Sequence, residues 1–431
     1  MDKNLLAKTP PMGWNSWDCY GAAVNEEQLL GNAQYMADNL KEYGWQYVVC
    51  DIQWYEPKAR NNDYNNFTEL CIDEYSRLIP AENRFPSSKG GKGFRPISDK
   101  IHAMGLKFGI HIMRGIPRGA VHADTPILGT DVTARQIAHH FSVCSWNTDM
   151  YGIDYRKRGA QEYYNSIFKM YAEWGVDFVK VDDICVTEFR KWDNPYSAKE
   201  EIELIRNAIN NCGRDMVLSL SPGPAELSVA DHLCANANMW RLTGDFWDNW
   251  EQLYAMFDRC EKWAPYVGGG CWPDCDMLPL GKISKNGTCH GPQNRFTQFT
   301  KPEQITLMSL WSVFRSPLMF GGEMRENDEW TLSLMTNREV LDINQHSHGA
   351  KQAYRDEKLI IWTSVAQDSS EVLALFNVSD KPITAKAVLA DLGLKSAKTA
   401  YELWDKTSTD IKDNALRCEI PAHGAKLFKL K

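Results

Sequence analysis

The sequence predicts an α/β protein in which a (β/α)8 barrel, residues 1–348, is followed by an antiparallel β-sandwich, residues 349–431. Strand-like and helix-like segments alternate throughout the first range, the order that produces a parallel sheet covered by helices. Three of the strand-like segments deliver an acidic residue, Asp51, Asp182 or Asp245. Barrel enzymes carry their active-site residues at the C-terminal ends of the strands, so this pattern predicts a rim of carboxylates on a barrel.

Short apolar runs mark the barrel strands, and the run with the weakest strand pattern is 266–278. The candidates are residues 11–17, 47–54, 107–113, 178–183, 216–223, 237–245, 266–278 and 317–324. Between them, apolar residues recur at three- and four-residue spacing in 25–44, 197–213 and 302–314, which indicates amphipathic helices. Eight such units in alternation predict a closed TIM barrel.

Two connections, 56–95 and 114–160, are too long to be simple links. Both follow predicted strands, so both are expected on the catalytic face, where long loops shape a pocket.

The C-terminal part has a different pattern. Short β-type segments are separated by Asp, Ser, Asn and Gly, and no helical period remains, which predicts the antiparallel sandwich. The segments are 359–365, 371–378, 383–389, 399–405 and 425–430.

Composition narrows the classes of function. A net charge of −8 argues against nucleic acid as a partner, and no apolar run is long enough to span a membrane. The first residues have no signal-peptide pattern, so we expect a cytoplasmic protein with its twelve scattered cysteines mostly reduced. No CxxC pair is present, and no metal site is expected. The 16 Trp and 17 Tyr suit a sugar-binding protein, although core packing explains most of them equally well.

Asp182 and Asp245 are candidates for the two carboxyl groups that glycoside hydrolysis needs, one ionised and one protonated. Lys180 lies two residues before Asp182, on the same face of the strand, and would keep Asp182 ionised. Phe246 and Trp247 follow Asp245, and apolar surroundings would raise its pKa. The alternative is that these acids pair with arginines or cap helices.

Six motifs in order resemble glycoside hydrolase family 27, the family of α-galactosidases and α-N-acetylgalactosaminidases. They are TPPMGWNSWDCYG, CDIQW, VKVDD, RLTGD followed by DNW, CWPDCDMLPLG and VLDINQ. The resemblance covers the barrel from residue 9 to about 345, and the β-sandwich also matches the family's architecture. It implies a retaining mechanism with Asp182 as the nucleophile and Asp245 as the acid/base, and no cofactor.

The resemblance also implies a set of sugar-binding residues. Lys180 and Asp51 match residues on the O4 side of the sugar, and Arg241 and Asp276 match residues around O2 and the acid/base. Trp17 matches the aromatic wall of the sugar site, with Trp54 beside it.

Ile52 departs from the α-galactosidase pattern, in which two adjacent carboxylates end the second strand. The second carboxylate binds the C6 hydroxymethyl group in those enzymes, and Ile52 cannot accept that hydrogen bond. β-L-Arabinopyranose has the ring configuration of α-D-galactopyranose without C6, so the apolar side chain favours the pentose. An unpaired galactose O6 would cost roughly 1–3 kcal/mol, or about 10–100-fold in rate. The alternative is a galactosidase that tolerates the change.

Other departures leave alternatives open. Ser221 stands where galactosidases have Glu and N-acetylgalactosaminidases have Ser, but Pro222 and Gly223 replace the usual Trp-Pro. His111 replaces a Tyr and either binds substrate or is structural, and His290 is a candidate from an inserted loop. Cys144 and Cys185 lie near the family's cysteine pair, and whether they form a disulfide stays open.

We therefore expect a retaining exo-glycoside hydrolase that removes terminal β-L-arabinopyranosyl groups from small glycosides or oligosaccharides. An α-galactosidase or α-N-acetylgalactosaminidase of the same family is the alternative, and a non-catalytic sugar-binding protein is a more distant one. A homo-oligomer is possible. An aldolase or isomerase using Lys180 as a Schiff base is disfavoured, since a carboxylate follows within two residues.

Overall fold

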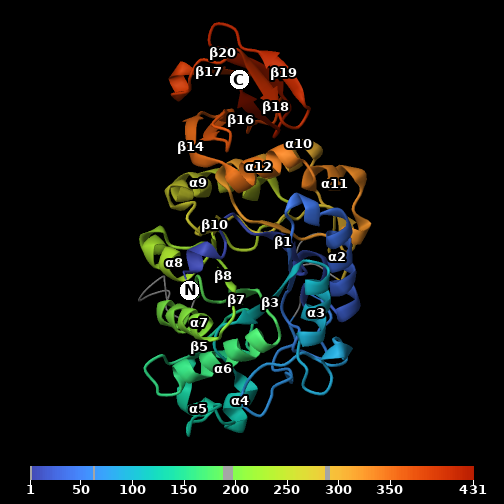
Figure 1. The fold of residues 1–431 in the computed structure, drawn as a ribbon, viewed down its shortest axis with the longest axis vertical. Helices are drawn as coiled ribbons and strands as arrows, with labels where there is room; N and C mark the ends of the chain where they lie inside the picture. The colour runs from blue at the N-terminus through green and yellow to red at the C-terminus, as the bar shows by residue number, and fades with distance from the viewer. Residues whose placement is uncertain (1, 62–63, 188–197, 287–291) are drawn as a thin grey trace.

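The computed structural model describes residues 2–61, 64–187, 198–286 and 292–431 (Figure 1). Within these residues, eight parallel strands form one sheet in the order β10-β9-β8-β7-β3-β2-β1-β13. They are β1 (Met12–Asn15), β2 (Tyr47–Cys50), β3 (Lys107–Met113), β7 (Phe178–Asp182), β8 (Val217–Leu220), β9 (Met239–Arg241), β10 (Trp272–Asp274) and β13 (Leu318–Phe320). A further isolated parallel bridge joins Leu278, which follows β10 along the chain, to Phe320 of β13 at the other edge of the curled sheet. The predicted barrel is confirmed, and each of the eight predicted segments contains one of its strands, the weakly marked 266–278 included.

Helices cover the outside of the sheet (Figure 1). Several begin with capping sequences: Asn25 and Gln28 bond reciprocally at the start of α2, and Thr300 and Glu303 do so at the start of α10. The helices of the barrel part are α1 (Trp17–Tyr20), α2 (Glu26–Asn39), α3 (Arg95–Ala103), α6 (Ala160–Glu173), α7 (Lys199–Asn211), α8 (Ala230–Asn236), α9 (Trp250–Trp263), α10 (Lys301–Phe314), α11 (Glu329–Met335) and α12 (Arg338–His346).

The long connection 114–160 has structure of its own. Strands β4 (Ile116–Pro117), β6 (Met150–Ile153) and β5 (Ala138–Val143) form a small antiparallel sheet beside α4 (Arg118–Ala123) and α5 (Ala134–Ile137). Figure 1 shows α4 and α5 at the end of the molecule opposite the C-terminal strands. A second short hairpin, β11 (Lys282–Ile283) with β12 (Arg295–Phe296), follows β10.

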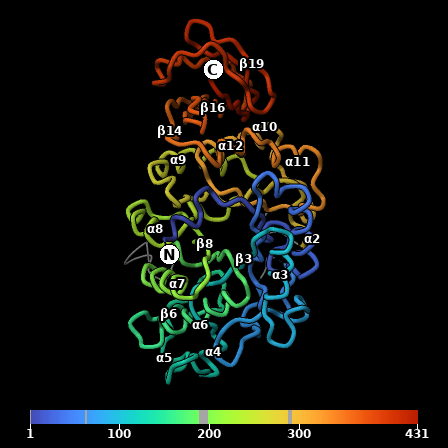
Figure 2. Tube along the Cα trace, viewed as in Figure 1, coloured from blue at the N-terminus to red at the C-terminus, as the bar shows by residue number. Residues whose placement is uncertain are grey.

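The C-terminal strands form two antiparallel sheets, as predicted. The larger has the order β14-β15-β16-β21-β18-β19, and β17 pairs with β20. The strands are β14 (His348–Arg355), β15 (Leu359–Val365), β16 (Glu371–Asn377), β17 (Ile383–Val388), β18 (Thr399–Glu402), β19 (Thr407–Asp410), β20 (Ala415–Ile420) and β21 (Ala425–Leu430). Along the chain trace, these strands stack on α10 and α12 (Figure 2).

Both faces of β15 in the larger sheet are buried, which explains its unbroken apolar run. Leu359 and Ile361 belong to the core between the two sheets, whereas Ile360 and Trp362 belong to the core shared with the barrel. The ring of Trp362 lies 6.2 Å from that of Phe314 on α10. Because side chains alternate along a strand, one run of residues supplies both cores.

Candidate active site

A pocket of about 350 Å³ opens at the C-terminal ends of the barrel strands. Most of the side chains predicted to bind or transform a sugar line it. These are Trp17, Asp51, Ile52, Lys180, Asp182, Arg241, Asp245 and Asp276. The parallel strands bring residues far apart in the sequence to one rim, as the barrel prediction required.

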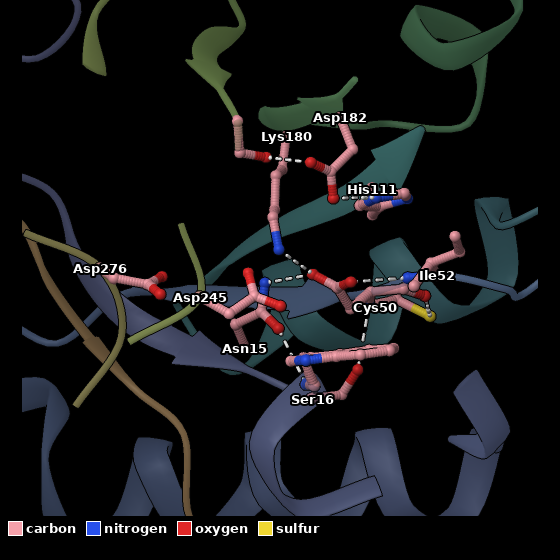
Figure 3. A network of polar contacts seen from close by, with 12 residues as sticks. Asn15, Ser16, Cys50, Ile52, His111, Lys180, Asp182, Asp245 and Asp276 are labelled. Atoms are coloured by element: carbon pink, nitrogen blue, oxygen red, sulfur yellow. Dashed lines mark hydrogen bonds and ion pairs between the residues drawn. The ribbon is translucent and has the colours of Figure 1, made fainter. Parts of the chain in front are cut away.

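Both carboxylate oxygens of Asp182, the last residue of β7, accept a hydrogen bond. Ser221 Oγ donates to Oδ1 over 2.8 Å, and His111 Nε2 lies 3.0 Å from Oδ2 (Figure 3). Burial would raise the pKa of Asp182, but the His111 hydrogen bond and the charge of Lys180 together hold the pKa well below its usual value. Asp182 is therefore an ionised carboxylate at neutral pH.

Lys180 on β7 and Asp51, which follows β2, form a buried ion pair across the intervening strand β3. Lys180 Nζ lies 2.9 Å from Asp51 Oδ2, which also accepts a hydrogen bond of 2.7 Å from Asn15 Nδ2. Figure 3 shows Lys180 extending from beside Asp182 toward Asn15. Burial opposes the charged form of each partner, but their mutual attraction lowers the pKa of Asp51 and raises that of Lys180. The pocket floor thus holds fixed charges that can bind hydroxyl groups.

Asp245 lies at the mouth of the pocket, with its side chain 56% exposed. Arg241 Nη2 lies 3.2 Å from Asp245 Oδ1 and 2.7 Å from Asp276 Oδ2, so one guanidinium joins the two acids. Asp276 also accepts a hydrogen bond of 2.8 Å from the backbone N–H of Phe246. Burial raises the pKa of Asp276 to about 6, with Arg241 opposing the shift and Asp245 adding to it. Asp245 is more than half exposed and pairs with Arg241, so the apolar surroundings predicted for it are not found, although Phe246 and Trp247 are buried.

Ile52 lies in the pocket wall next to Asp51 and is 1% exposed. Its backbone N–H donates to Asp51 Oδ1 over 2.9 Å, which fixes its position against the ion pair. The side chain offers no hydrogen-bonding atom to a sugar bound at Asp51 and Lys180.

Three predicted sugar-binding residues are not part of the pocket lining, and they support it from behind. Trp54 is fully buried, packs edge-on against Phe94 at 5.2 Å between ring centroids, and donates to the backbone oxygen of His111 over 2.7 Å. His111 and Ser221 contact Asp182. All three therefore lie behind the pocket wall: two of them contact the carboxylate of Asp182, and Trp54 contacts the backbone of His111.

Two further predictions concern cysteine and histidine. Cys144 and Cys185 are buried free thiols in this structure, so the disulfide left open by the sequence is not formed. His290 lies outside the described residues.

The pocket also contains side chains for which no role was predicted. Asp18 is 4% exposed, and burial together with Asp276 raises its pKa well above the usual value. Tyr64 and Trp146 come from the long connections 56–95 and 114–160. Those connections were expected to shape a pocket, but nothing in their sequence singles out these two rings.

The described part of the chain contains no helix with the length and apolarity needed to cross a bilayer.

Comparison with known families gives a match for most of the chain. Residues 155–346 match the family described as Alpha galactosidase A, and residues 356–430 match the Alpha galactosidase C-terminal beta sandwich domain. An α-galactosidase from Oryza sativa subsp. japonica is 27% identical over 433 residues, covering 99% of this chain and 86% of the relative.

Two solved structures are much more similar. A GH27 β-L-arabinopyranosidase from Geobacillus stearothermophilus is 57% identical with a TM-score of 0.97, covering 100% of this chain and 98% of that chain. A Bacillus halodurans C-125 protein, described provisionally as an α-N-acetylgalactosaminidase, is 54% identical with a TM-score of 0.88, covering 99% of this chain and 98% of that chain. With its barrel, its carboxylate-lined pocket and these matches, the chain belongs to glycoside hydrolase family 27.

Proposed function

We propose that this glycoside hydrolase is a retaining β-L-arabinopyranosidase acting on small glycosides. The observation that carries the proposal is Ile52, a buried apolar side chain beside the Asp51–Lys180 pair. A galactose hydroxymethyl group at this position would lose the hydrogen bonds it makes to water, whereas a pentose has no such group to bury. The Geobacillus stearothermophilus β-L-arabinopyranosidase supports this assignment, and a variant of that enzyme has been solved in complex with arabinose.

The proposed chemistry is a double displacement. Asp182, kept ionised by His111 and Lys180, attacks the anomeric carbon while Asp245 protonates the departing glycosidic oxygen. A water molecule deprotonated by Asp245 then breaks the bond between the sugar and Asp182, which releases arabinose with its original anomeric configuration. The solvent contact of Asp245 suits a group that exchanges protons with water.

An α-N-acetylgalactosaminidase is the second candidate, because Ser221 is small and the Bacillus halodurans neighbour carries that provisional description. The hydroxyl of Ser221 is engaged with Asp182, however. This contact gives the serine a reason to be present that does not involve an acetamido group, so we rank the pentosidase first.

The test is kcat/KM for p-nitrophenyl β-L-arabinopyranoside, α-D-galactopyranoside and N-acetyl-α-D-galactosaminide. The pentoside is expected to lead the galactoside by at least about tenfold, and Ile52→Asp is expected to reverse that order. Ile52→Val serves as the matched control, since it keeps an apolar wall and should keep the preference. A wild-type preference for either hexoside would overturn the assignment.

Retention and the roles of the two acids are tested together. We expect ¹H NMR to show β-L-arabinopyranose as the first product, and Asp182→Asn to lose at least about 10³-fold in kcat. Asp245→Asn should lose far more activity on glycosides with poor leaving groups than on the p-nitrophenyl glycoside. Added azide should restore turnover of this variant and give the β-glycosyl azide as the product. First release of the α-anomer would refute the double displacement.

A further inference from the structure

Three aromatic rings lead from the floor of the pocket to its mouth. Tyr64 stacks on Trp17, with ring centroids 6.1 Å apart and planes at 22°, and Trp146 lies 5.8 Å from Tyr64 with planes at 41°. Exposure increases outward: Trp17 is 9% exposed, and Trp146 is 39% exposed. All three line the pocket that contains Asp182 and Asp245.

The connection that carries Trp146 is anchored to the barrel three residues further along the chain. Trp146 lies between β5 and β6, and Gln53 Nε2 holds the same connection by donating to Asp149 Oδ2 over 2.5 Å. Gln53 directly follows Ile52, so the connection is anchored to the strand end that forms the sugar site. Anchoring the connection near Trp146 reduces the freedom that is lost when a ligand stacks on the ring, which favours binding.

The pocket lining combines charged and apolar groups. The charged groups surround the floor, where Asp51, Lys180 and Asp182 lie. The same pocket also has an apolar part of its lining, which includes Pro222, Gly223, Trp247 and Met277. A second sugar placed there would lose hydration of its hydroxyl groups with few partners in return, whereas an apolar ring would lose nothing comparable.

We infer that Tyr64 and Trp146 form a leaving-group site for an aromatic aglycone, so that the preferred substrates are aryl glycosides. This inference rests on the proposed function for the reaction, but it concerns the group that departs and not the sugar that is retained. The aglycone ring stacks on Trp146 while the glycosidic oxygen faces Asp245.

The test compares two substrates that share a sugar and differ in the leaving group. 4-Methylumbelliferyl β-L-arabinopyranoside carries a flat ring, and β-L-arabinopyranosyl fluoride carries none. Trp146→Ala is expected to lower kcat/KM about tenfold for the first substrate and less than about twofold for the second. Trp146→Phe should restore most of the difference.

Phe141→Ala is the matched control, because Phe141 is an exposed aromatic residue of the same connection, 85% exposed and not part of the pocket lining. It should leave both substrates unchanged. Equal losses on both substrates in Trp146→Ala would overturn the inference. A larger loss on an arabinopyranosyl disaccharide than on the aryl glycoside would also overturn it, in favour of a sugar leaving group.

The outcome stays separate from that of the proposed function. If the enzyme prefers galactose, the same ratio is measured with the 4-methylumbelliferyl α-galactoside and α-galactosyl fluoride. The inference about the leaving-group site is then decided by that ratio: a larger loss in Trp146→Ala on the aryl glycoside than on the fluoride supports it, and equal losses overturn it.

Discussion

Asp182 shows how single residues determine the chemistry of this site. A buried carboxylate is costly unless its oxygens are hydrogen-bonded and its charge is compensated. Here His111, Ser221 and Lys180 supply both, and the pKa of Asp182 stays well below its usual value. The side chain of His111 is fully buried, and its Nδ1 has no hydrogen-bond partner among the described residues. Its side-chain hydrogen bond is therefore the one between Nε2 and Asp182.

We predict that His111 is a positioning residue for Asp182. His111→Phe should lower kcat about tenfold or more with little change in KM, because a hydrogen bond to a charged group is lost. The acidic limb of the kcat/KM profile should move to higher pH, since that bond lowers the pKa of Asp182. His111→Gln, which keeps a donor, should recover much of the loss. A change in KM alone would contradict this role.

Asp274 and Asp276 lie close together at the C-terminal end of β10, with Arg241 as a neighbouring cation of both. Asp274 accepts a hydrogen bond of 2.9 Å from the backbone N–H of Asp276. Burial and the neighbouring Asp276 raise the pKa of Asp274 to about 7, with Arg241 opposing them. An unfolded chain would ionise this group near pH 4, so the folded protein holds the extra proton between about pH 4 and pH 7.

The stability of the protein should therefore fall as pH rises through that window, because the folded state binds more protons. Asp274→Asn removes the titration and keeps the acceptor oxygen. We expect the thermal midpoint of this variant, relative to that of the wild type, to rise between pH 5 and pH 8. The rise should be equivalent to at least about 1 kcal/mol. A difference that does not vary with pH would show that Asp274 ionises as it does in water.

For the whole molecule, the shared core between barrel and C-terminal sheet is the main structural consequence of the fold. Ile360 and Trp362 contribute to the same core as α10, while Leu359 and Ile361 hold the second sheet. Phe376 on β16 contacts Phe257 on α9 with ring centroids 5.0 Å apart. Neither part buries its apolar surface without the other, so we expect them to unfold together.

Calorimetry of the wild type should then show one transition. Trp362→Ala should lower its midpoint, since truncating a buried Trp costs about 3–5 kcal/mol. Tyr354→Ala on the neighbouring β14, where the side chain is 44% exposed, should have little effect. Two separate transitions, with only one of them affected by Trp362→Ala, would contradict the shared core.

Much of the fold and of the candidate site could be predicted from the sequence, because both depend on local sequence patterns. Alternating segments with acids at strand ends specify a barrel with its chemistry at one rim, and short β-type segments separated by turn residues specify a sandwich. Asp182, Asp245 and Ile52 follow strand ends or adjoin them, so their position in the pocket follows from the order of the chain.

The remaining features depend on contacts between distant segments, which no local pattern encodes. The assignment of His111 and Ser221 to Asp182 arises because β3 and β8 flank β7 in the sheet. Tyr64 and Trp146 meet because two long connections fold over the same rim, and Trp54 turns into the core although it adjoins the site. The order of the sequence determines at the end of which strand each site residue lies. The packing of neighbouring strands and of the long connections determines what its side chain contacts.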